Sequence, residues 1–296
     1  LSDGFTVSRK QIGLQASHSN FSKDSTRIMR LFVHAQQLDL RVGADVRYGI
    51  ATNLNLIDDT FRRTRQNAQL FLSILRHSKH IASTLRRMHR WQVLDNYIPE
   101  FGAIRSLVRY DRPHEYTVDE HTQYAIENSE EKTLSEMKDG AHFLNILKSL
   151  QKPEILRLAI LLHDVGKGIQ GKTTHEHRSV EAATQVLNRL GLQNEDTQII
   201  LFLISSHLEI NHIARQRDLD DPVTIEQFAE LVGNEEKLKM LYLLTFADIR
   251  AVSIGVWTDW NAILLRQLYE RTLKHLRGEP YRLKLGELKT QVRQIT

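Results

Sequence analysis

Apolar residues recur every three or four positions along most of this chain, which predicts a succession of amphipathic helices. Four such helical faces precede residue 95. Their apolar positions are Ile28, Leu31, Phe32 and Ala35; Ile50, Leu54, Ile57 and Phe61; Leu70, Phe71, Ile74 and Leu75; and Ile81, Leu85, Met88 and Trp91. Residues 1–22 show no sustained period, so we expect a mobile lead-in there. The pattern predicts an all-α protein.

A break in the helical pattern at residues 97–101 divides the chain into two parts. We predict a smaller N-terminal helical module over residues 1–94 and a main helical domain over residues 95–277. A basic tail follows over residues 278–296. Because Leu1 is not an initiating methionine, we expect the chain to be a piece of a longer protein, with the tail beginning a further region.

The most apolar helix begins at Pro153 and leads into His163, Asp164 and a glycine-rich turn. Its apolar stripe is too wide for a surface helix, so we expect this helix to be central. Gly166 is predicted to cap it, which places the two polar residues in its last turn. An imidazole beside a carboxylate can hold a divalent metal. The dipeptide by itself is more often a polar helix end, so it needs partners.

Further polar residues stand where other apolar stripes begin, end or are interrupted. His121 and His177 open helices, His207 ends one, and Asp248 lies within a helix that otherwise looks buried. A buried carboxylate is costly unless it is paired or bound to a metal. Each case has an ordinary explanation, such as an ion pair of Asp248 with Arg250 or with a histidine. Their recurrence favours a shared metal site.

A loop rich in glycine and lysine follows the central helix and includes Gly166, Lys167 and Gly168. Glycines beside a lysine suggest a close approach to phosphate, although the spacing differs from that of a Walker loop. Neither a cysteine pair of the CxxC type nor a GxSxG elbow occurs in the sequence. The loop therefore suggests phosphate chemistry without defining it.

Composition narrows the class of protein. The 296 residues contain no cysteine, which excludes disulfides and thiolate chemistry and fits a cytoplasmic location. No apolar run reaches membrane-spanning length, so we expect no membrane partner. The 40 basic and 36 acidic residues are intermixed, without the basic stripe that a nucleic-acid-binding domain needs, so we expect no nucleic acid.

The order His121, His163-Asp164, His177, His207, Asp248 resembles that of the HD superfamily of metal-dependent phosphohydrolases, all-α domains whose ligands come from separate helices. Several longer blocks are similar to the central region of the bifunctional uridylyltransferase/uridylyl-removing enzymes, which modify the PII regulatory protein of nitrogen metabolism. These blocks are YIPEF at 97–101, YTVDEHT at 116–122, LLHDVGKG at 161–168, RDLDDP at 217–222 and LYLLTFADIRAV at 241–252. Together the resemblance covers roughly residues 25–277.

The resemblance implies that this domain removes UMP from a tyrosine of the PII protein by hydrolysing a phosphodiester. In that family a nucleotidyltransferase domain adds UMP and ACT domains sense glutamine, and both are expected in the full-length protein. Neither is visible in this sequence. We therefore expect this chain to remove UMP but not to add it, with a PII-type protein as substrate and a uridine nucleotide as product.

The resemblance also implies site residues. One divalent cation would be held by His121, His163, Asp164 and Asp248. A second would be held or approached by His177 and His207, with Lys167 steadying the phosphate. Mg²⁺ or Mn²⁺ is expected first, with Fe or Zn as alternatives, and the cation would lower the pKa of an attacking water. The family pattern places histidine at Ser206 and glycine at Glu181, so we expect the second site to be less complete than the first.

Two other functions are compatible with the same residues. A nucleotide phosphohydrolase of the HD superfamily would use the same metal site, because that site does not select the substrate. A non-catalytic sensing or binding module would retain the architecture but would lack primary ligands. Here all four ligands of the first cation are present, which favours an enzyme.

Overall fold

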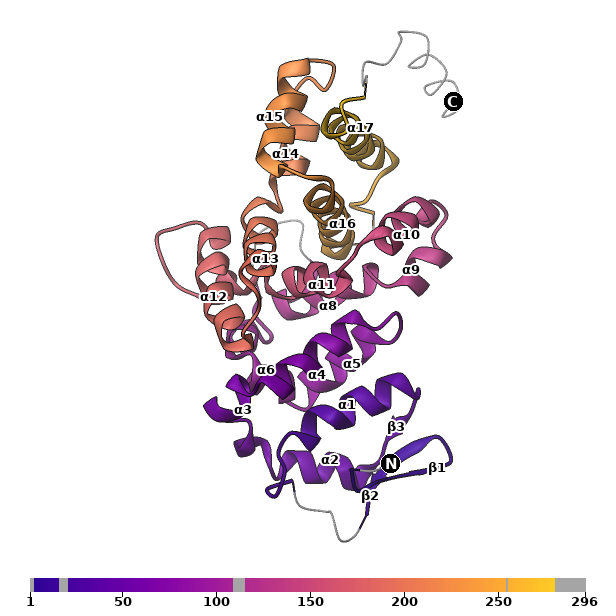
Figure 1. Ribbon diagram of the computed structural model, residues 1–296, viewed down its shortest axis with the longest axis vertical. Helices are drawn as coiled ribbons and strands as arrows, with labels where there is room; N and C mark the ends of the chain where they lie inside the picture. Colours follow the sequence, from indigo (N-terminus) through magenta and orange to yellow (C-terminus); the bar gives the residue numbers. More distant parts are fainter. Residues whose placement is uncertain (1–2, 16–20, 109–114, 254, 280–296) are drawn as a thin grey trace.

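The computed structural model describes residues 3–15, 21–108, 115–253 and 255–279 (Figure 1). Helices form nearly all of the regular structure in these ranges, so the predicted all-α class is confirmed. No described helix combines the length and the apolar character needed to cross a membrane. The predicted basic tail lies outside the described residues from position 280 onward.

The first described residues form a small sheet. Its strands are β1 (Phe5–Ser8), β2 (Gln11–Leu14) and β3 (Arg41–Val42). β1 and β2 pair as an antiparallel hairpin, and β3 pairs with β2 in parallel. Arg9 and Lys10 both have positive φ, as the two-residue turn of a hairpin requires. The predicted mobile lead-in is therefore wrong for residues 5–14, because Phe5 and Ile12 are buried.

Short helices cover this sheet and complete the N-terminal part. They are α1 (Arg27–Gln37), α2 (Ala44–Ala51), η2 (Leu54–Leu56), α3 (Asp59–Arg63), α4 (Arg65–Arg76), α5 (Ile81–Arg90), α6 (Val93–Tyr97) and α7 (Pro99–Gly102). The second predicted helical face is divided among α2, η2 and α3. Asp58 causes the last division, since its side chain accepts a hydrogen bond from the Phe61 amide and starts α3 afresh.

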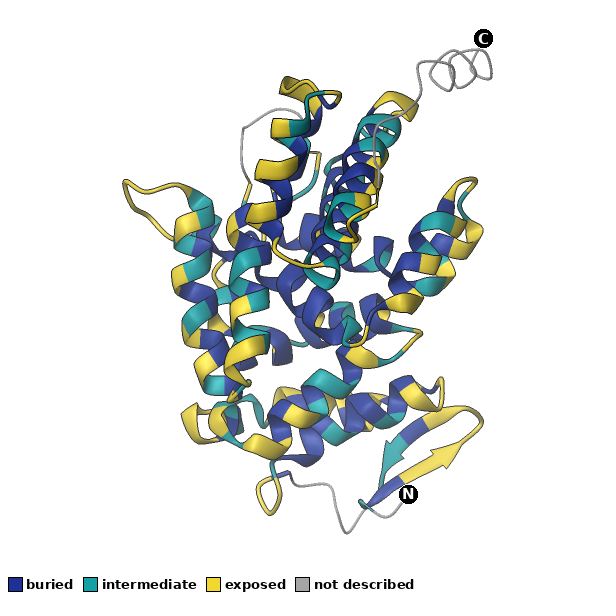
Figure 2. Ribbon diagram, turned by 45° about the horizontal axis from the view of Figure 1, so that its top comes forward, coloured by how far each residue is buried: buried dark blue, intermediate teal, exposed yellow. Residues whose placement is uncertain are grey.

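The remaining helices form the part of the chain that contains α11. They are α8 (Val118–Asn128), α9 (Glu131–Glu136), α10 (Gly140–Ser149), α11 (Pro153–Leu162), η3 (Val165–Gly168), α12 (His175–Leu190), α13 (Asn194–Ser206), α14 (Glu209–Gln216), α15 (Pro222–Val232), α16 (Glu235–Val252) and α17 (Asp259–Leu276). Every residue of α11 after Pro153 is buried, as the wide apolar stripe predicts. α11 contacts α4, α8, α13 and α16, and Figure 2 shows this buried centre in dark blue.

The N-terminal part packs directly against this centre. The apolar core continues without a break from Phe5 in β1 to Tyr269 in α17. The predicted boundary near residue 94 falls inside α6, and the division into residues 1–94, 95–277 and 278–296 stays a prediction. The N-terminal helices therefore help to fix the position of α11.

Arg157 of α11 illustrates this dependence. Its side chain is 1% exposed, and its guanidinium donates hydrogen bonds to the carbonyls of Leu75 (2.7 Å) and His77 (3.2 Å) at the end of α4. We expect Arg157→Ala to lower the free energy of unfolding by about 2 kcal/mol, because two carbonyls lose their donor and a cavity opens in the core. Urea unfolding measures this change.

Arg63→Ala is the matched control for Arg157→Ala. Arg63 forms an exposed ion pair with Asp59 one turn away on α3, a kind of pair that contributes little. We expect its removal to change the free energy of unfolding much less. Equal losses for the two variants would contradict the role given to Arg157.

His89 of α5 links two other helices and predicts a pH dependence. Its ring nitrogens lie 2.6 Å from Asp95 Oδ1 on α6 and 2.9 Å from Asp119 Oδ2 on α8. Burial opposes charge on both members of the His89–Asp119 pair, but their hydrogen bonds outweigh it. The pKa of His89 is raised above 6.5, and the pKa of Asp119 is lowered to about 2.

A raised pKa in the folded state stabilises the protein at pH values below the unfolded pKa of 6.5 and is lost as the pH rises through the folded value. We therefore expect the stability difference between the wild type and His89→Gln to shrink as the pH is raised from about 6 to about 9. Urea unfolding across this range measures it. A difference for His89→Gln that grows with pH would be the opposite of this result.

Candidate metal centre

Polar side chains from four separate segments meet beside the end of α11. His121 comes from α8, His163 and Asp164 from the end of α11, His207 from the end of α13, and Asp248 from α16. His121 Nε2 lies 2.9 Å from Asp248 Oδ1 and 3.8 Å from Asp164 Oδ2. His163 Nε2 lies 3.3 Å from Asp164 Oδ2 and 3.5 Å from Asp248 Oδ1. Five of the predicted site residues are therefore brought together.

The end of α11 allows two adjacent side chains to face one point. His163 keeps helical dihedrals (φ −59°, ψ −32°), whereas Asp164 has left the helix (φ −113°, ψ 5°). Neighbours on a regular helix point about 100° apart, and the change of backbone after Leu162 removes that restriction. The helical backbone therefore ends between His163 and Asp164, which allows both side chains to face the same point.

Gly166 has a different role from the predicted helix cap. It lies within η3 without the left-handed conformation of such a cap. A Cβ at this position would lie 2.3 Å from the His175 carbonyl oxygen and 2.3 Å from the Ser179 amide nitrogen of α12. The Gly166 amide also donates to Ser179 Oγ at 2.9 Å. Glycine is thus required for the close approach of η3 to α12.

Two histidines are oriented by the carbonyls of their own helices. Nδ1 of His163 donates to the Ile160 oxygen, and Nδ1 of His207 donates to the Ile204 oxygen, both at 2.7 Å. A neutral imidazole that donates through Nδ1 carries its lone pair on Nε2. Such second hydrogen bonds fix the tautomer of a metal-binding histidine. On both residues Nε2 is therefore the nitrogen available to a ligand.

The electrostatics of the cluster suit a cation. Burial alone would raise the pKa of Asp164 and of Asp248, but the neighbouring histidines, together with Lys167 beside Asp164, hold both values well below 3.8. Burial lowers the pKa of His207 below 6.5. Burial also opposes the charge on His163, yet the two carboxylates raise its pKa to about 10, so a cation bound at Nε2 would take the place of a proton there. Two ionised carboxylates in a buried site favour positive charge between them.

The residues fit a divalent metal. Ligand atoms of His121, His163 and Asp248 all lie within 4.8 Å of one another, as do those of His163, Asp164 and His207. Among the described residues, none completes a hydrogen bond with His163 Nε2 or with Asp164 Oδ1, although both atoms are buried. Buried polar atoms without partners are costly, and a cation satisfies both. Imidazole nitrogen and carboxylate oxygen suit several divalent metals.

His177 does not reach this cluster. Its side chain is 59% exposed and lies 3.5 Å from Glu181 Oε1, one turn along α12. His175 lies there instead: its Nε2 is 3.6 Å from Asp164 Oδ1, and its ring centroid is 6.0 Å from that of His207. Residues two apart on a helix point in different directions, so only one of the two histidines can face α11.

The spacing of the buried residues along α12 predicts that His175 faces the core. Ser179 and Ala183 are buried, and His175 precedes them by one and two turns of four residues. His177 shares its face with exposed residues such as Glu181. The prediction of His177 as a ligand did not take this spacing into account.

The other predicted residues are placed as follows. Lys167 is carried by η3, and its Nζ donates to Asp164 Oδ2 at 2.6 Å. Ser206, which stands where the family pattern has histidine, is buried, and its Oγ lies 3.4 Å from Ser205 Oγ. Lys167 is therefore held at the edge of the cluster.

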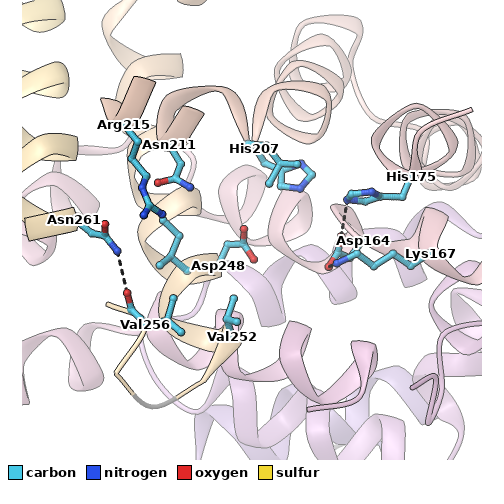
Figure 3. Close-up of a pocket in the computed structure, with 12 residues that line it drawn as sticks. Asp164, Lys167, His175, His207, Asn211, Arg215, Asp248, Val252, Val256 and Asn261 are labelled. Atoms are coloured by element: carbon cyan, nitrogen blue, oxygen red, sulfur yellow. Dashed lines mark hydrogen bonds and ion pairs between the residues drawn. The ribbon is translucent and has the colours of Figure 1, made fainter. Parts of the chain in front are cut away.

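A cavity of about 310 Å³ opens onto this cluster. Asp248, with a side chain that is 14% exposed, is the most accessible of the five clustered residues (Figure 3). Lys167 and His175 lie on one side of it, and Asn211 and Arg215 of α14 lie on the other. Neither Asn211 nor Arg215 was predicted from the sequence, although both follow His207 at intervals of four and thus share its helical face.

Family models match two parts of this chain. A family model for the HD domain matches residues 131–248, and a model described as the third domain of the uridylyltransferase GlnD matches residues 5–97. In solved structures, the fold is similar to that of a tRNA-processing enzyme (TM-score 0.56, 15% identity, 96% of this chain and 64% of that one). It is also similar to that of the Thermotoga maritima CCA-adding enzyme (TM-score 0.51, 15% identity, 100% and 65%).

Fold, site and family model together define an HD-domain protein. Within that class, the chain is similar to the central part of the bifunctional uridylyltransferase/uridylyl-removing enzymes. It is 35% identical to the one from Azospirillum brasilense over 277 residues, which covers 93% of this chain and 29% of that protein. It is 39% identical to the one from Nitrosococcus oceani over 229 residues, which covers 77% and 25%. The chain therefore spans less than a third of these relatives.

Proposed function

We propose that this chain is the uridylyl-removing part of such an enzyme: a metal-dependent phosphodiesterase that releases UMP from a uridylylated PII protein. The HD domain and the relatives named for uridylyl removal support a hydrolase. The observation that carries the proposal is the convergence of three histidines and two aspartates from four segments on one buried point beside an open cavity.

The site residues would have different roles in the reaction. A divalent cation bound there, Mg²⁺ or Mn²⁺ in our proposal, supplies a water of lowered pKa and neutralises phosphoryl charge. His121, His163, Asp164, His207 and Asp248 would hold the metal. His175 stands beside Asp164 at the mouth of the cluster, where it can bind or orient the scissile phosphate.

Lys167 is suited to the charge of the substrate. Its side chain is 14% exposed and its ammonium group is held by Asp164, so it can donate a second hydrogen bond to a phosphate oxygen at the cavity. A tyrosyl phosphodiester has a phenol as its leaving group, with a pKa of about 10. Such a group needs little help from an acid, so the described residues need not include a dedicated general acid.

The test is to incubate the purified chain with uridylylated PII protein and Mn²⁺ and to follow UMP release and the mass of the PII protein. Parallel reactions contain free UTP or cyclic UMP. We expect UMP and unmodified PII to appear, with slower or no turnover of the free nucleotides. Turnover of free nucleotides alone would favour the HD nucleotide phosphohydrolase, and no turnover of any substrate would favour the non-catalytic binding module.

A further inference from the structure

The face of α14 that continues from His207 carries functional groups that the metal centre does not use. Leu208 and His207 both have helical dihedrals, so α14 follows α13 with little interruption. Asn211 and Arg215 stand one and two turns beyond His207. In Figure 3 both side chains reach from α14 toward the cavity, on the side of Asp248 opposite Lys167.

Both groups have hydrogen-bonding capacity that the protein does not use. Asn211 Oδ1 is buried, and no described residue donates a hydrogen bond to it. Arg215 is exposed, and its guanidinium makes no ion pair with a carboxylate in the described part of the chain. A buried acceptor without a donor is costly, so its retention beside a cavity points to a ligand that supplies the donor.

The surroundings of these groups indicate the kind of ligand. Leu208, Ile249, Val252 and Val256 form apolar walls at this end of the cavity. Asn261 also lines it, but its Nδ2 donates to the Val256 oxygen at 2.9 Å and so holds that wall in place. An apolar slot with one amide and one cation suits a flat, polar-edged ring attached to a phosphate, because the walls contact the ring faces while the two polar groups bind its edge and the anion.

We propose that Asn211 and Arg215 form the subsite for the nucleoside monophosphate part of the substrate, with Arg215 on a phosphate oxygen and Asn211 on the nucleoside. This proposal deepens the proposed function and rests on it. The substrate has two arms on one phosphorus atom. The nucleoside arm lies toward α14, and the arm that leads to the protein tyrosine lies toward Lys167 and His175, at the end of the cavity beside the exposed loop of residues 170–174.

The test measures binding of UMP and of uridine by calorimetry, with Mn²⁺ present, to the wild type, Arg215→Ala and Asn211→Ala. We expect Arg215→Ala to weaken UMP binding at least about tenfold and to leave uridine binding unchanged, because only UMP carries the phosphate. Asn211→Ala should weaken both ligands by a similar factor of about five. Arg217→Ala is the matched control, since Arg217 is exposed two residues further on and does not line the cavity.

Failure of this proposal can be told apart from failure of the proposed function. If Arg215→Ala and Asn211→Ala bind UMP as tightly as Arg217→Ala, or if the wild type binds no UMP, the subsite is wrong, whether or not the wild type hydrolyses uridylylated PII. If UMP binding shows the expected losses but uridylylated PII is not a substrate, the subsite stands and the choice of PII is wrong. With an active wild type, Arg215→Ala should also raise KM more than it lowers kcat, and thermal unfolding should show that each variant is folded.

Discussion

Replacing Asp164 by asparagine is expected to lower the rate of phosphodiester hydrolysis at least about a thousandfold while the chain stays folded. Asp164 is the residue on which the site converges: His121, His163, Lys167 and His175 all lie within 3.8 Å of its carboxylate. Asparagine keeps the shape but removes the charge that a cation and these groups require. UMP release from uridylylated PII measures the rate, and circular dichroism with thermal unfolding checks the fold.

Asp218→Asn provides the control for Asp164→Asn. Asp218 is an exposed aspartate after α14, and its carboxylate accepts a hydrogen bond from the Asp220 amide. Its replacement should leave the hydrolysis rate within about twofold of the wild type. Normal turnover by folded Asp164→Asn would rule out the metal centre as the site of hydrolysis.

The second large effect separates two histidines at the start of one helix. We expect His175→Gln to lower the hydrolysis rate about a hundredfold, because His175 faces Asp164 and His207 across the mouth of the cluster. His177→Gln should leave the rate within about twofold, because His177 is exposed and contacts Glu181. Both variants replace histidine by glutamine, two positions apart on α12. A difference between their hydrolysis rates therefore reports where the histidine lies and not the chemical nature of the replacement.

The measurement for this pair is kcat for UMP release, with thermal unfolding of both variants as a check on folding. A loss confined to His177→Gln would restore the residue that the sequence pattern suggested and would remove His175 from the site. Equal, small effects for both would limit the site to the five clustered residues.

The central position of α11 could be predicted from the sequence because apolar residues dominate this helix. A wide apolar stripe requires burial on all sides, so the position of the helix at the centre follows from its residues alone. The polar residues at its end and within α16 could be recognised for the same reason, since polar groups in apolar stripes need partners. Which partners they meet depends on packing between helices distant in sequence, and the local periodicity of each helix does not reveal that packing.

In two places the local sequence pattern predicted a feature that the structure does not have. Gly166 follows an apolar helix, as a cap would, but its real constraint is the backbone of α12 at His175 and Ser179, in a later helix. The first residues have no helical period, yet Phe5 and Ile12 are buried in a hairpin too short to give a sustained signal. In both cases a contact between distant segments decided the structure.

The most direct test of the central claim is the amount of Mn²⁺ retained by the purified chain after dialysis, measured by elemental analysis for the wild type and for the double variant His121→Ala/Asp248→Asn. These two residues lie on different helices and meet at 2.9 Å. The account predicts at least one ion per chain in the wild type and its loss from a folded double variant. A wild type without bound ion, or a double variant that retains it, would contradict the account.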